Sequence, residues 1–399
     1  MDMTFIDPEP PDATGGGIRT YLRLVARACR AQGWPVRVYT HNPGAYAAAV
    51  AAGAEALAIG RRPLPRPWRS LLYRLAYGEN LAFEHALWLR DELEKGDGPG
   101  RLYEFCDYGG YAFFALRHPW LRARTVVRIH TPHYLAARPA RTLAFPAWAL
   151  GRFRERQCLR RAERLTAPSA EFARERLPWL RGWTYLPNPL PDREAAAHVP
   201  GPLPASGDIL YLGRVEPRKG VLVLVRAFLR LAAENPRARL TLVGAASPGA
   251  YSQSVRALID AQPPELRARL AWEPPCPPER RAALLGRFRV LAVPSLWENS
   301  PYVYFEGLSA GLLCVGSATG EMKAAAEVTG GLLARPGDEK DWLRALRRAV
   351  GGDFGGEARE AQRRYLETRR PDVLARTLDY YRGAADAAGA WGAAKGAGP

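Results

Sequence analysis

Short apolar segments alternate with amphipathic ones along this chain, and no other feature restricts its fold as strongly. In the first half, apolar runs stand at residues 4–6, 36–39 and 125–129. Helical periodicity extends from Ile18 to Gln32, and Gly33 provides a C-terminal stop. Apolar strands that alternate with amphipathic helices form a doubly wound parallel sheet. The first half is therefore predicted to be an α/β domain.

The second half repeats this alternation. We expect strands at residues 209–212, 240–243 and 290–293. We expect helices at about 221–234, 251–261, 279–286 and 302–310. The predicted fold class is therefore α/β, with two Rossmann-like, doubly wound parallel-sheet domains.

A stretch rich in proline and glycine separates the two halves. It runs from Pro187-Asn-Pro-Leu-Pro191 to Pro200-Gly-Pro-Leu-Pro204 and is predicted to be a stiff, partly extended linker. A chain of 399 residues also has the length of about two domains. We expect an N-terminal domain over residues 1–190, a C-terminal domain over 207–356, a helix over 357–383 and a frayed Ala/Gly-rich tail over 384–399.

The charge balance restricts the partners of the chain. Its 57 Lys and Arg residues outnumber 40 Asp and Glu residues, which gives a formal net charge of +17. This favours an anionic partner: a phosphate ligand, an anionic lipid surface or nucleic acid. The basic residues are spread along the chain without a nucleic-acid-binding signature, so nucleic acid is not an expected partner. A genome biased toward Arg and Ala would explain the charge equally well.

Cysteine and hydropathy patterns indicate a cytoplasmic protein. The five cysteines form no C-x-x-C pair and no metal-ligand spacing, which is typical of reduced, buried thiols. No apolar run approaches the ~18 residues of a bilayer span. The first residues lack the basic and apolar regions of a signal peptide.

Two glutamates eight positions apart follow the apolar run at 290–293. Glu298 lies in the loop after that run, and Glu306 lies one turn inside the helix expected at 302–310. The start of a helix offers unpaired backbone N–H groups and a partial positive charge, so it attracts phosphate. Carboxylates before and inside the helix can accept hydrogen bonds from sugar hydroxyls. The segment is a candidate site for a sugar diphosphate, and the alternative is an ordinary strand–loop–helix unit with solvated glutamates.

A basic loop follows the strand expected at 209–212, and it reads Gly213-Arg214-Val-Glu-Pro-Arg218-Lys219-Gly220. Arg214 and Lys219 can converge on one diphosphate, Arg with a planar fork and Lys with a point charge. Together they would stabilise the charge of a leaving nucleotide. The alternative is a solvated basic turn.

Two features of the first half lie where open α/β sheets bind ligands, after the carboxyl ends of strands. The loop Thr14-Gly15-Gly16-Gly17 lets the backbone approach a ligand and point N–H groups at it. It does not have the G-x-G-x-x-G spacing of a dinucleotide site. His130 ends the strand expected at 125–129, a position where a lone His is more often a structural group.

Taken in order, these motifs resemble those of the retaining, GT-B-fold glycosyltransferases of family four (glycosyl transferases group 1). The E-x7-E pair, the G-R-x-x-x-x-K-G loop, the glycine loop and His130 carry the resemblance. Weaker echoes are Ala167-Pro-Ser169, Leu186-Pro-Asn-Pro189 and Glu104-Phe-Cys-Asp107-Tyr-Gly-Gly110. The resemblance covers residues from about 4 to 345, and it implies two Rossmann-like domains that face a cleft.

The resemblance also implies an activity: transfer of a hexose-type sugar from a nucleoside diphosphate sugar to an acceptor hydroxyl, with retention. Arg214 and Lys219 would bind the diphosphate, Glu306 the ribose and Glu298 the hexose. The implied catalytic residues are His130, Arg214, Lys219 and Glu298. The implied donor-binding residues are Gly16, Gly17, Arg214, Lys219, Glu298, Asn299, Ser300, Pro301, Tyr302, Val303 and Glu306. The implied acceptor-side residues are Gly16 and Asp107, and neither a metal nor another cofactor is implied.

The acceptor is less constrained, and an envelope glycan, a lipid-linked glycan and a small molecule all fit. Segments 61–74 and 134–164 combine Arg with aromatic and Leu residues, which suits the surface of an anionic membrane. They suggest a peripheral contact at the inner face of the membrane. The alternative is a helix pair with a solvated basic face.

Three other functions compete with glycosyl transfer. A sugar-nucleotide epimerase on the same fold would need acid/base groups at the sugar, and the motifs supply no convincing set. A glycan phosphorylase would need a lysine-bound pyridoxal signature that is not apparent. A non-catalytic nucleic-acid-binding protein would exploit the charge of +17 and would bind polynucleotides with steep salt sensitivity.

Overall fold

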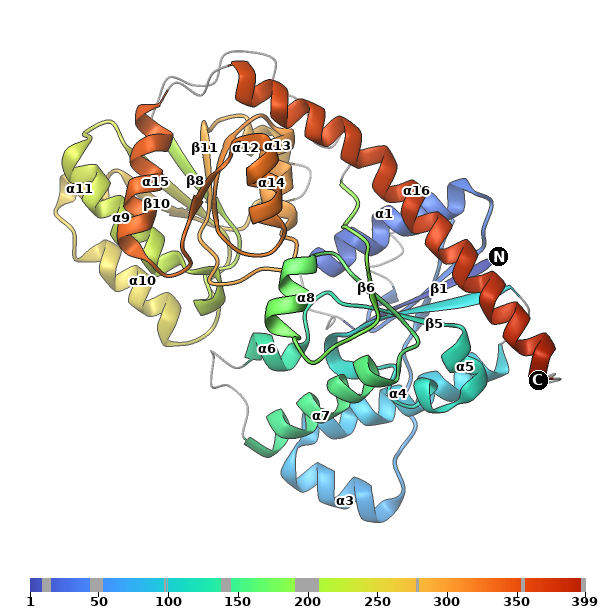
Figure 1. Cartoon of the computed structure of the whole chain (residues 1–399). Helices are drawn as coiled ribbons and strands as arrows, with labels where there is room; N and C mark the ends of the chain where they lie inside the picture. The colour runs from blue at the N-terminus through green and yellow to red at the C-terminus, as the bar shows by residue number, and fades with distance from the viewer. Residues whose placement is uncertain are drawn as a thin grey trace. The chain divides into compact units, whose positions relative to one another are not determined.

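Alternating strands and helices form two parallel sheets, one in each of two units of the chain (Figure 1). The computed structural model describes residues 1–8, 16–43, 53–96, 98, 100–137, 145–190, 208–277, 280–352 and 356–395. Unit 1 comprises Met1–Pro189 and Asp372–Pro399, and unit 2 comprises Leu190–Pro371. Most of the expected linker, residues 191–204, lies outside the described residues, as do Thr14 and Gly15 of the glycine loop.

The sheet of unit 1 contains seven strands among the described residues, in the order β3-β2-β1-β4-β5-β6-β7. The strands are β1 (Asp2–Asp7), β2 (Val36–Thr40), β3 (Glu55–Ala58), β4 (Arg101–Cys106), β5 (Thr125–Arg128), β6 (Arg164–Ala167) and β7 (Trp183–Tyr185). Neighbouring strands are parallel, and Met3 of β1 pairs with Val36 of β2 and Leu102 of β4. Because β1 lies between β2 and β4, the direction of winding changes between β1 and β4.

Helices cover both faces of this sheet (Figure 1). α1 buries Tyr21, Leu22, Val25 and Cys29 at helical spacing, as an amphipathic helix on a sheet requires. The helices of unit 1 are α1 (Gly17–Ala31), α3 (Arg66–Leu75), α4 (Tyr77–Lys95), α5 (Pro119–Ala123), α6 (His133–Ala137), α7 (Phe145–Arg161) and α8 (Ala170–Arg176), with short 3-10 turns η1 (Tyr108–Gly110) and η2 (Ala115–Arg117).

The sheet of unit 2 contains six strands among the described residues, in the order β10-β9-β8-β11-β12-β13. The strands are β8 (Asp208–Leu212), β9 (Arg239–Val243), β10 (Leu270–Glu273), β11 (Val290–Val293), β12 (Leu313–Ser317) and β13 (Leu332–Ala334). β8 pairs with both β9 and β11, so the winding changes direction between β8 and β11.

Alternation along the strands of unit 2 supplies two apolar cores. Ile209 and Tyr211 of β8 belong to one cluster with Phe228 and Trp342, whereas Leu210 belongs to the other cluster. The helices of unit 2 are α9 (Val221–Glu234), α10 (Ala250–Asp260), α11 (Pro264–Arg267), α12 (Arg281–Leu285), α13 (Tyr302–Ser309), α14 (Glu321–Thr329) and α15 (Glu339–Gly351), with the 3-10 turn η4 (Pro217–Lys219). The expected fold class, α/β with two doubly wound parallel sheets, is confirmed.

The last helix, α16 (Gly356–Lys395), contributes residues to both units. In unit 2, Arg369 forms an ion pair with Glu321, at 2.8 Å. In unit 1, the hydroxyl of Tyr381 donates to Glu104 at 2.6 Å. The helix extends to Lys395, so residues 384–395, which were expected to be frayed, are helical, and Ala384 and Ala388 are buried. Among the described helices, none is long and apolar enough to cross a membrane.

Candidate functional site

Two loops of unit 2 that carry predicted site residues lie at the carboxyl ends of neighbouring strands. The basic loop, residues 213–220, follows β8, and the loop with Glu298 follows β11. β8 and β11 flank the point at which the winding of this sheet changes direction. Open α/β sheets bind their ligands at such a point. The two motifs, far apart in the sequence, therefore meet at the place where a ligand site is expected.

A glycine allows these two loops to pack closely against each other. Gly220 has a φ of +65°, a left-handed conformation that side chains rarely adopt. A Cβ atom at this position would overlap the carbonyl group of Pro294, the first residue of the other loop. Next to this contact, the backbone N–H of Leu296 donates to the carbonyl oxygen of Arg218 at 2.8 Å. Glycine at 220 thus allows the close approach that brings the two motifs together.

The contact places two cations on one glutamate. The Nζ atom of Lys219 forms an ion pair with Oε1 of Glu298, and Nη1 of Arg218 lies 3.0 Å from the same oxygen. The hydroxyl of Ser295 donates to that oxygen at 2.9 Å. All three charged side chains are largely buried, with exposed fractions of 18% for Lys219, 16% for Arg218 and 9% for Glu298. The cluster thus concentrates positive charge at the ends of β8 and β11.

Arg214, the arginine that the motif singled out, has different surroundings. Its side chain is 68% exposed, and Nη2 lies 3.4 Å from Oε2 of Glu216. Glu216 also pairs with Arg218, at 2.9 Å. Arg214 therefore joins the cluster through Glu216, whereas Arg218 contacts Glu298 directly. Three cations and two carboxylates make up this group, so it keeps a net positive charge.

The cations control the protonation of Glu298. Burial alone would raise the pKa of Glu298, but the charges of Arg218 and Lys219 and hydrogen bonds from Lys219 and Ser295 outweigh it and lower the pKa to about 2. Burial and the charge of Arg218 lower the pKa of Lys219, while Glu298 opposes the change. Glu298 is therefore a carboxylate at any physiological pH.

This pKa predicts how stability depends on pH. The pKa of Glu298 is about 4.5 in the unfolded chain and about 2 in the folded one, so its stabilisation is complete above pH 4.5 and is lost as the pH falls toward 2. Between these values, the free energy of unfolding of the wild type should fall more steeply with acid than that of Glu298→Gln. Urea unfolding at a series of pH values measures both slopes. Equal slopes would show that Glu298 does not titrate as the geometry requires.

The segment after Glu298 leads into α13, whose cap residue Pro301 provides no side-chain hydrogen bond to the first turn. The carbonyl oxygen of Asn299 accepts from the N–H of Glu321, at 2.9 Å. Asn299, Pro301 and Tyr302 are buried, Ser300 and Val303 are half-buried, and all five belong to the segment between β11 and the first turn of α13.

Glu306 lies on α13, one turn beyond the helix start, and is nearly buried. Its Oε1 atom lies 2.8 Å from Nη1 of Arg281 on α12. Within the described part of the chain, no ion pair or hydrogen bond joins its side chain to Lys219 or Glu298. The structure therefore brings Glu298 and Lys219 together and places Glu306 with a separate cation.

In unit 1, the predicted residues surround the ends of β1, β4 and β5. Gly16 is the cap residue of α1, and Gly17 is its first residue. One turn later, the ring of Tyr21 makes an edge contact with the ring of His130, with centroids 4.9 Å apart. Asp107, after β4, is fully buried, and its Oδ1 atom accepts from the backbone N–H groups of His130 (2.9 Å) and Thr131 (3.2 Å). Asp107 thus fixes the loop that carries His130.

Burial sets the charge states of these two side chains. Burial, helped by the charge of Arg128, lowers the pKa of His130 well below its usual range, so its imidazole is neutral at physiological pH. Burial raises the pKa of Asp107 to about 7, although the two N–H groups oppose the rise. A neutral imidazole can donate one hydrogen bond and accept another.

Two family models cover most of the chain. A model described as Glycosyl transferases group 1 matches residues 206–351, and one described as Glycosyl transferase 4-like domain matches residues 16–183. The chain belongs to the group 1 glycosyl transferases. The matched segments contain the site residues of both units, from Gly16 to Glu306.

Curated relatives of this glycosyltransferase share about a quarter to a third of its residues. A D-inositol 3-phosphate glycosyltransferase of Nocardia farcinica is 29% identical over 297 residues, which are 65% of this chain and 65% of the relative. One of Rhodococcus opacus is 26% identical over 363 residues, which are 86% of this chain and 79% of the relative. The chain thus spans just under two thirds of the first relative.

Solved structures share the fold of this glycosyltransferase. A sucrose-phosphate synthase from Thermosynechococcus elongatus matches with a TM-score of 0.70 at 20% identity, over 96% of this chain and 98% of that one. Anabaena HepE in complex with UDP-glucose matches with a TM-score of 0.67 at 18% identity, over 95% of this chain and all of that one. These structures show that the fold is GT-B.

The structure adds three residues to those that the motifs predicted in this glycosyltransferase. Arg218 contacts Glu298, and Arg281 contacts Glu306. The buried carboxylate of Glu155 on α7 accepts hydrogen bonds from the backbone N–H groups of Gly109 (2.7 Å), His133 (2.8 Å) and Tyr134 (3.0 Å). It ties the loop after β4 to the start of α6. Only Arg218 had a signal in the sequence, since it precedes Lys219 in the same loop.

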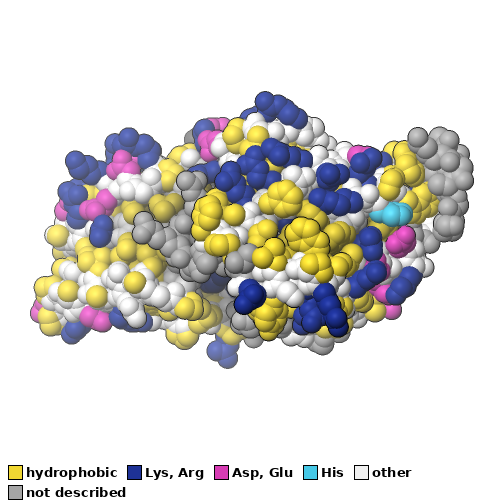
Figure 2. Space-filling view, turned by 90° about the horizontal axis from the view of Figure 1, so that it is seen from below, with side chains coloured by type: hydrophobic (Ala, Val, Ile, Leu, Met, Phe, Trp, Pro, Cys, Tyr) yellow, Lys and Arg dark blue, Asp and Glu magenta, His cyan; other side chains and the backbone are white. Residues whose placement is uncertain are grey.

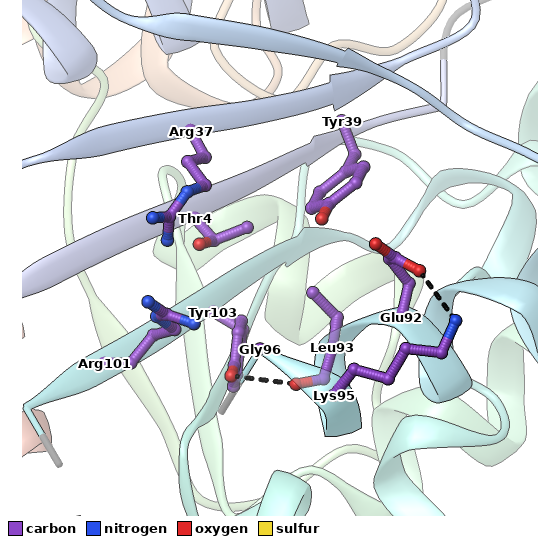
Figure 3. Close-up of a pocket in the computed structure, with 9 residues that line it drawn as sticks. All are labelled: Thr4, Arg37, Tyr39, Glu92, Leu93, Lys95, Gly96, Arg101 and Tyr103. Carbon is purple, nitrogen blue, oxygen red and sulfur yellow. Dashed lines mark hydrogen bonds and ion pairs between the residues drawn. The ribbon is translucent and has the colours of Figure 1, made fainter. Parts of the chain in front are cut away.

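A cavity of about 300 Å³ lies elsewhere in unit 1 (Figure 3). Its walls include Arg37 at the start of β2 and Arg101 at the start of β4. It therefore lies near the amino ends of these strands, whereas Asp107 and His130 follow the carboxyl ends of β4 and β5. Its cations are already engaged: Lys95 pairs with Glu92 at 3.3 Å, Arg37 with Glu55 at 3.1 Å and Arg101 with Asp2 at 3.3 Å. The cavity is thus separate from the candidate site in position, and its cations are paired within the chain.

Proposed function

We propose that this glycosyltransferase moves a hexose-type sugar from a nucleoside diphosphate sugar to an acceptor hydroxyl and retains the anomeric configuration. One observation carries the proposal. Lys219 and Arg218 gather, with Glu298, at the carboxyl ends of β8 and β11, where the winding of the unit 2 sheet changes direction. A diphosphate is the ligand that suits two cations at such a point.

In this proposal, unit 2 holds the donor. Lys219 and Arg218 contact the diphosphate, with Arg214 free to move toward it because its side chain is mostly exposed. Backbone N–H groups at the start of α13, near Pro301–Val303, add to the site. Charge builds up on the leaving diphosphate as the glycosidic bond breaks, and fixed cations stabilise that charge. Glu298 binds hexose hydroxyls, and Glu306 binds the ribose.

Unit 1 serves the acceptor side in this proposal. The neutral imidazole of His130 hydrogen-bonds a sugar hydroxyl, and the backbone at Gly16 and Gly17 approaches the donor and acceptor. The acceptor oxygen attacks on the face that the diphosphate leaves, and the departing phosphate takes the acceptor proton. This course needs no pair of glycosidase-like carboxylates. The cationic side chains offset the diphosphate charge, so we propose that no metal or other cofactor is required.

The names of the relatives suggest which acceptors and donors to test first. The curated relatives carry the name D-inositol 3-phosphate glycosyltransferase, and HepE was solved with UDP-glucose. These names favour a small phosphorylated polyol and a UDP-sugar as the first compounds to test, beside glycan and lipid-linked acceptors. We also propose a cytoplasmic location, which is supported by the free state of all five cysteines.

A thermal-shift screen tests the proposal. UDP, GDP, ADP and their sugars are each added, with and without EDTA, and a ligand that binds the native state raises the Tm. One nucleotide series should raise the Tm equally in both conditions. Incubation with the donor alone should leave it unchanged or slowly hydrolysed, whereas an epimerase would convert it. No shift with any nucleotide, together with salt-sensitive polynucleotide binding, would contradict the proposal.

Replacing Glu306 by alanine should mainly weaken donor binding. A hydrogen bond to a charged group contributes about 1.5–3 kcal/mol, so the donor Kd should rise roughly ten- to hundredfold. Calorimetric titration measures this change. Glu327→Ala, at an exposed position on α14, is the matched control and should bind like the wild type. If Glu306→Ala failed to fold, the pair with Arg281 would be structural instead.

A further inference from the structure

Helix α3 is almost entirely exposed. From Arg66 to Arg74, every residue is exposed except Leu72, which is half-buried. Trp68 is 62% exposed and Leu71 is 49% exposed. A ten-residue helix is too short to be stable by itself in water, since isolated helices below about 12–15 residues are marginal. Burial against its own chain stabilises α3 only slightly. A partner that covers α3 would therefore stabilise it more than it would most helices.

The two faces of α3 differ in chemistry. Trp68 and Leu71 are three positions apart, so they project from the same side of the helix. Arg66 and Arg69, also three positions apart, fall on the opposite side, and Arg74, three positions after Leu71, lies at the boundary between the two. Helices that lie in a membrane interface have this composition, with Trp and Leu on one face and basic residues on the other.

The exposed apolar residues of the molecule concentrate around α3. Among the described residues, seven large hydrophobic side chains are exposed, and six of them lie on α3, at the start of α4 or on α7: Trp68, Leu71, Tyr73, Tyr77, Phe145 and Phe153. α4 packs against both α3 and α7. In Figure 2, yellow and dark blue side chains gather together on the face seen from below, the side on which α3 and α7 lie in Figure 1.

The charge of this region is one-sided. Residues 61–78 contain five arginines and no acidic residue. Arg61 and Arg62 pair with Glu84 and Asp91 of α4. Within the described part of the chain, Arg66, Arg69 and Arg74 form no ion pair. These three guanidinium groups are therefore available to an anionic partner from outside the chain.

We propose that α3, with the neighbouring aromatic residues of α4 and α7, docks on an anionic phospholipid bilayer. Trp68 and Leu71 enter the headgroup layer, and Arg66, Arg69 and Arg74 contact lipid phosphates. An exposed Leu beside Trp gains from the acyl boundary and gains nothing from a polynucleotide backbone, so the apolar content favours lipid over nucleic acid. The inference does not depend on the proposed function, because it uses no residue of the candidate site.

Vesicle flotation of the full chain tests the inference. Vesicles of phosphatidylcholine alone are compared with vesicles of phosphatidylcholine mixed with phosphatidylglycerol, at low and high salt. The wild type should float with the anionic vesicles at low salt and less at high salt, because salt screens the arginines. The variant Trp68→Ser/Leu71→Ser should reduce the partition coefficient about tenfold or more. The variant Arg66→Glu/Arg69→Glu/Arg74→Glu should reduce it to a similar or larger extent.

Matched controls lie on unit 2. Val328 is the seventh exposed hydrophobic residue, at 58%. Arg237, Arg267 and Arg348 are exposed and form no ion pair within the described residues. Val328→Ser and Arg237→Glu/Arg267→Glu/Arg348→Glu should float like the wild type, and all variants should keep the wild-type Tm.

Four outcomes would overturn the inference. One is that the wild type floats with neither vesicle, and another is that it floats equally with both. A third is that the α3 variants float as well as the controls. The last is that sedimentation shows a dimer that Trp68→Ser/Leu71→Ser abolishes, which would assign this face to a second copy of the chain.

Discussion

Replacing Lys219 by alanine should lower the turnover of the glycosyltransferase by a factor of about 100 to 1,000. That is the usual cost of removing one fixed donor to the charge that develops in a transition state. Lys219 is largely buried, and it meets Glu298 and Arg218 at the ends of β8 and β11. The variant lacks the positive charge that would otherwise stabilise the leaving diphosphate. The fold should survive, because Arg218 remains paired with Glu298.

Turnover is measured with the donor and acceptor that the thermal-shift screen and an acceptor panel select, and the nucleotide Kd is measured in parallel. Lys340→Ala, at an exposed position in the same unit, is the matched control and should leave both quantities unchanged. Lys219→Ala with the kinetics of the wild type would count against a diphosphate at this cluster. If Lys219→Ala had a normal turnover but a raised nucleotide Kd, Lys219 would contribute to nucleotide binding and not to catalysis.

Replacing Glu298 by glutamine should destabilise unit 2 by about 3–5 kcal/mol, the cost of removing one partner from a buried ion pair. The substitution preserves shape but leaves Lys219 and Arg218 without their shared carboxylate. Native domains have only about 5–15 kcal/mol of stability, so the loss should be evident as a lower Tm. A bound nucleoside diphosphate should recover part of it, because its phosphates would neutralise the same cations.

Urea unfolding with and without nucleotide measures both effects. Glu234→Gln is the control: Glu234 pairs with Arg347 at 2.5 Å, but both side chains are about half exposed. Because water and salt screen an exposed pair, its removal should change the stability far less than the loss of Glu298 does. If Glu298→Gln were as stable as this control, the buried pair would contribute little. If nucleotide stabilised the wild type and not the variant, Glu298 itself would be a ligand of the nucleotide.

Several elements followed from local sequence because their apolar patterns are strong. The helix expected at 221–234 is α9, and the strands expected at 209–212, 240–243 and 290–293 agree with β8, β9 and β11 to within one residue. β12 was not predicted, since Leu313–Ser317 is only five residues long and contains Gly316, a residue type that is depleted in strands. Its pairing with β11, which the sequence does not display, makes it a strand.

For the candidate site too, local sequence predicted some features, and only the fold revealed the others. Types of residue and their order were evident, so Lys219 and Glu298 could be named. Their contact joins residues 79 positions apart and depends on the fit between Gly220 and Pro294. No local pattern contains that fit. For the same reason, the sequence could not show that Arg218 approaches Glu298 directly while Arg214 reaches the cluster through Glu216.

The final helix has a consequence for how the polypeptide matures. Tyr381 and Glu104 are 277 residues apart, yet they share a buried hydrogen bond within unit 1. During translation, the ribosome releases the strands of that unit first and supplies Tyr381 only after the whole of unit 2 has emerged. The unit that is begun first is therefore completed last, and in a nascent chain halted before α16, Glu104 can bond to Tyr21 but lacks its shorter hydrogen bond from Tyr381.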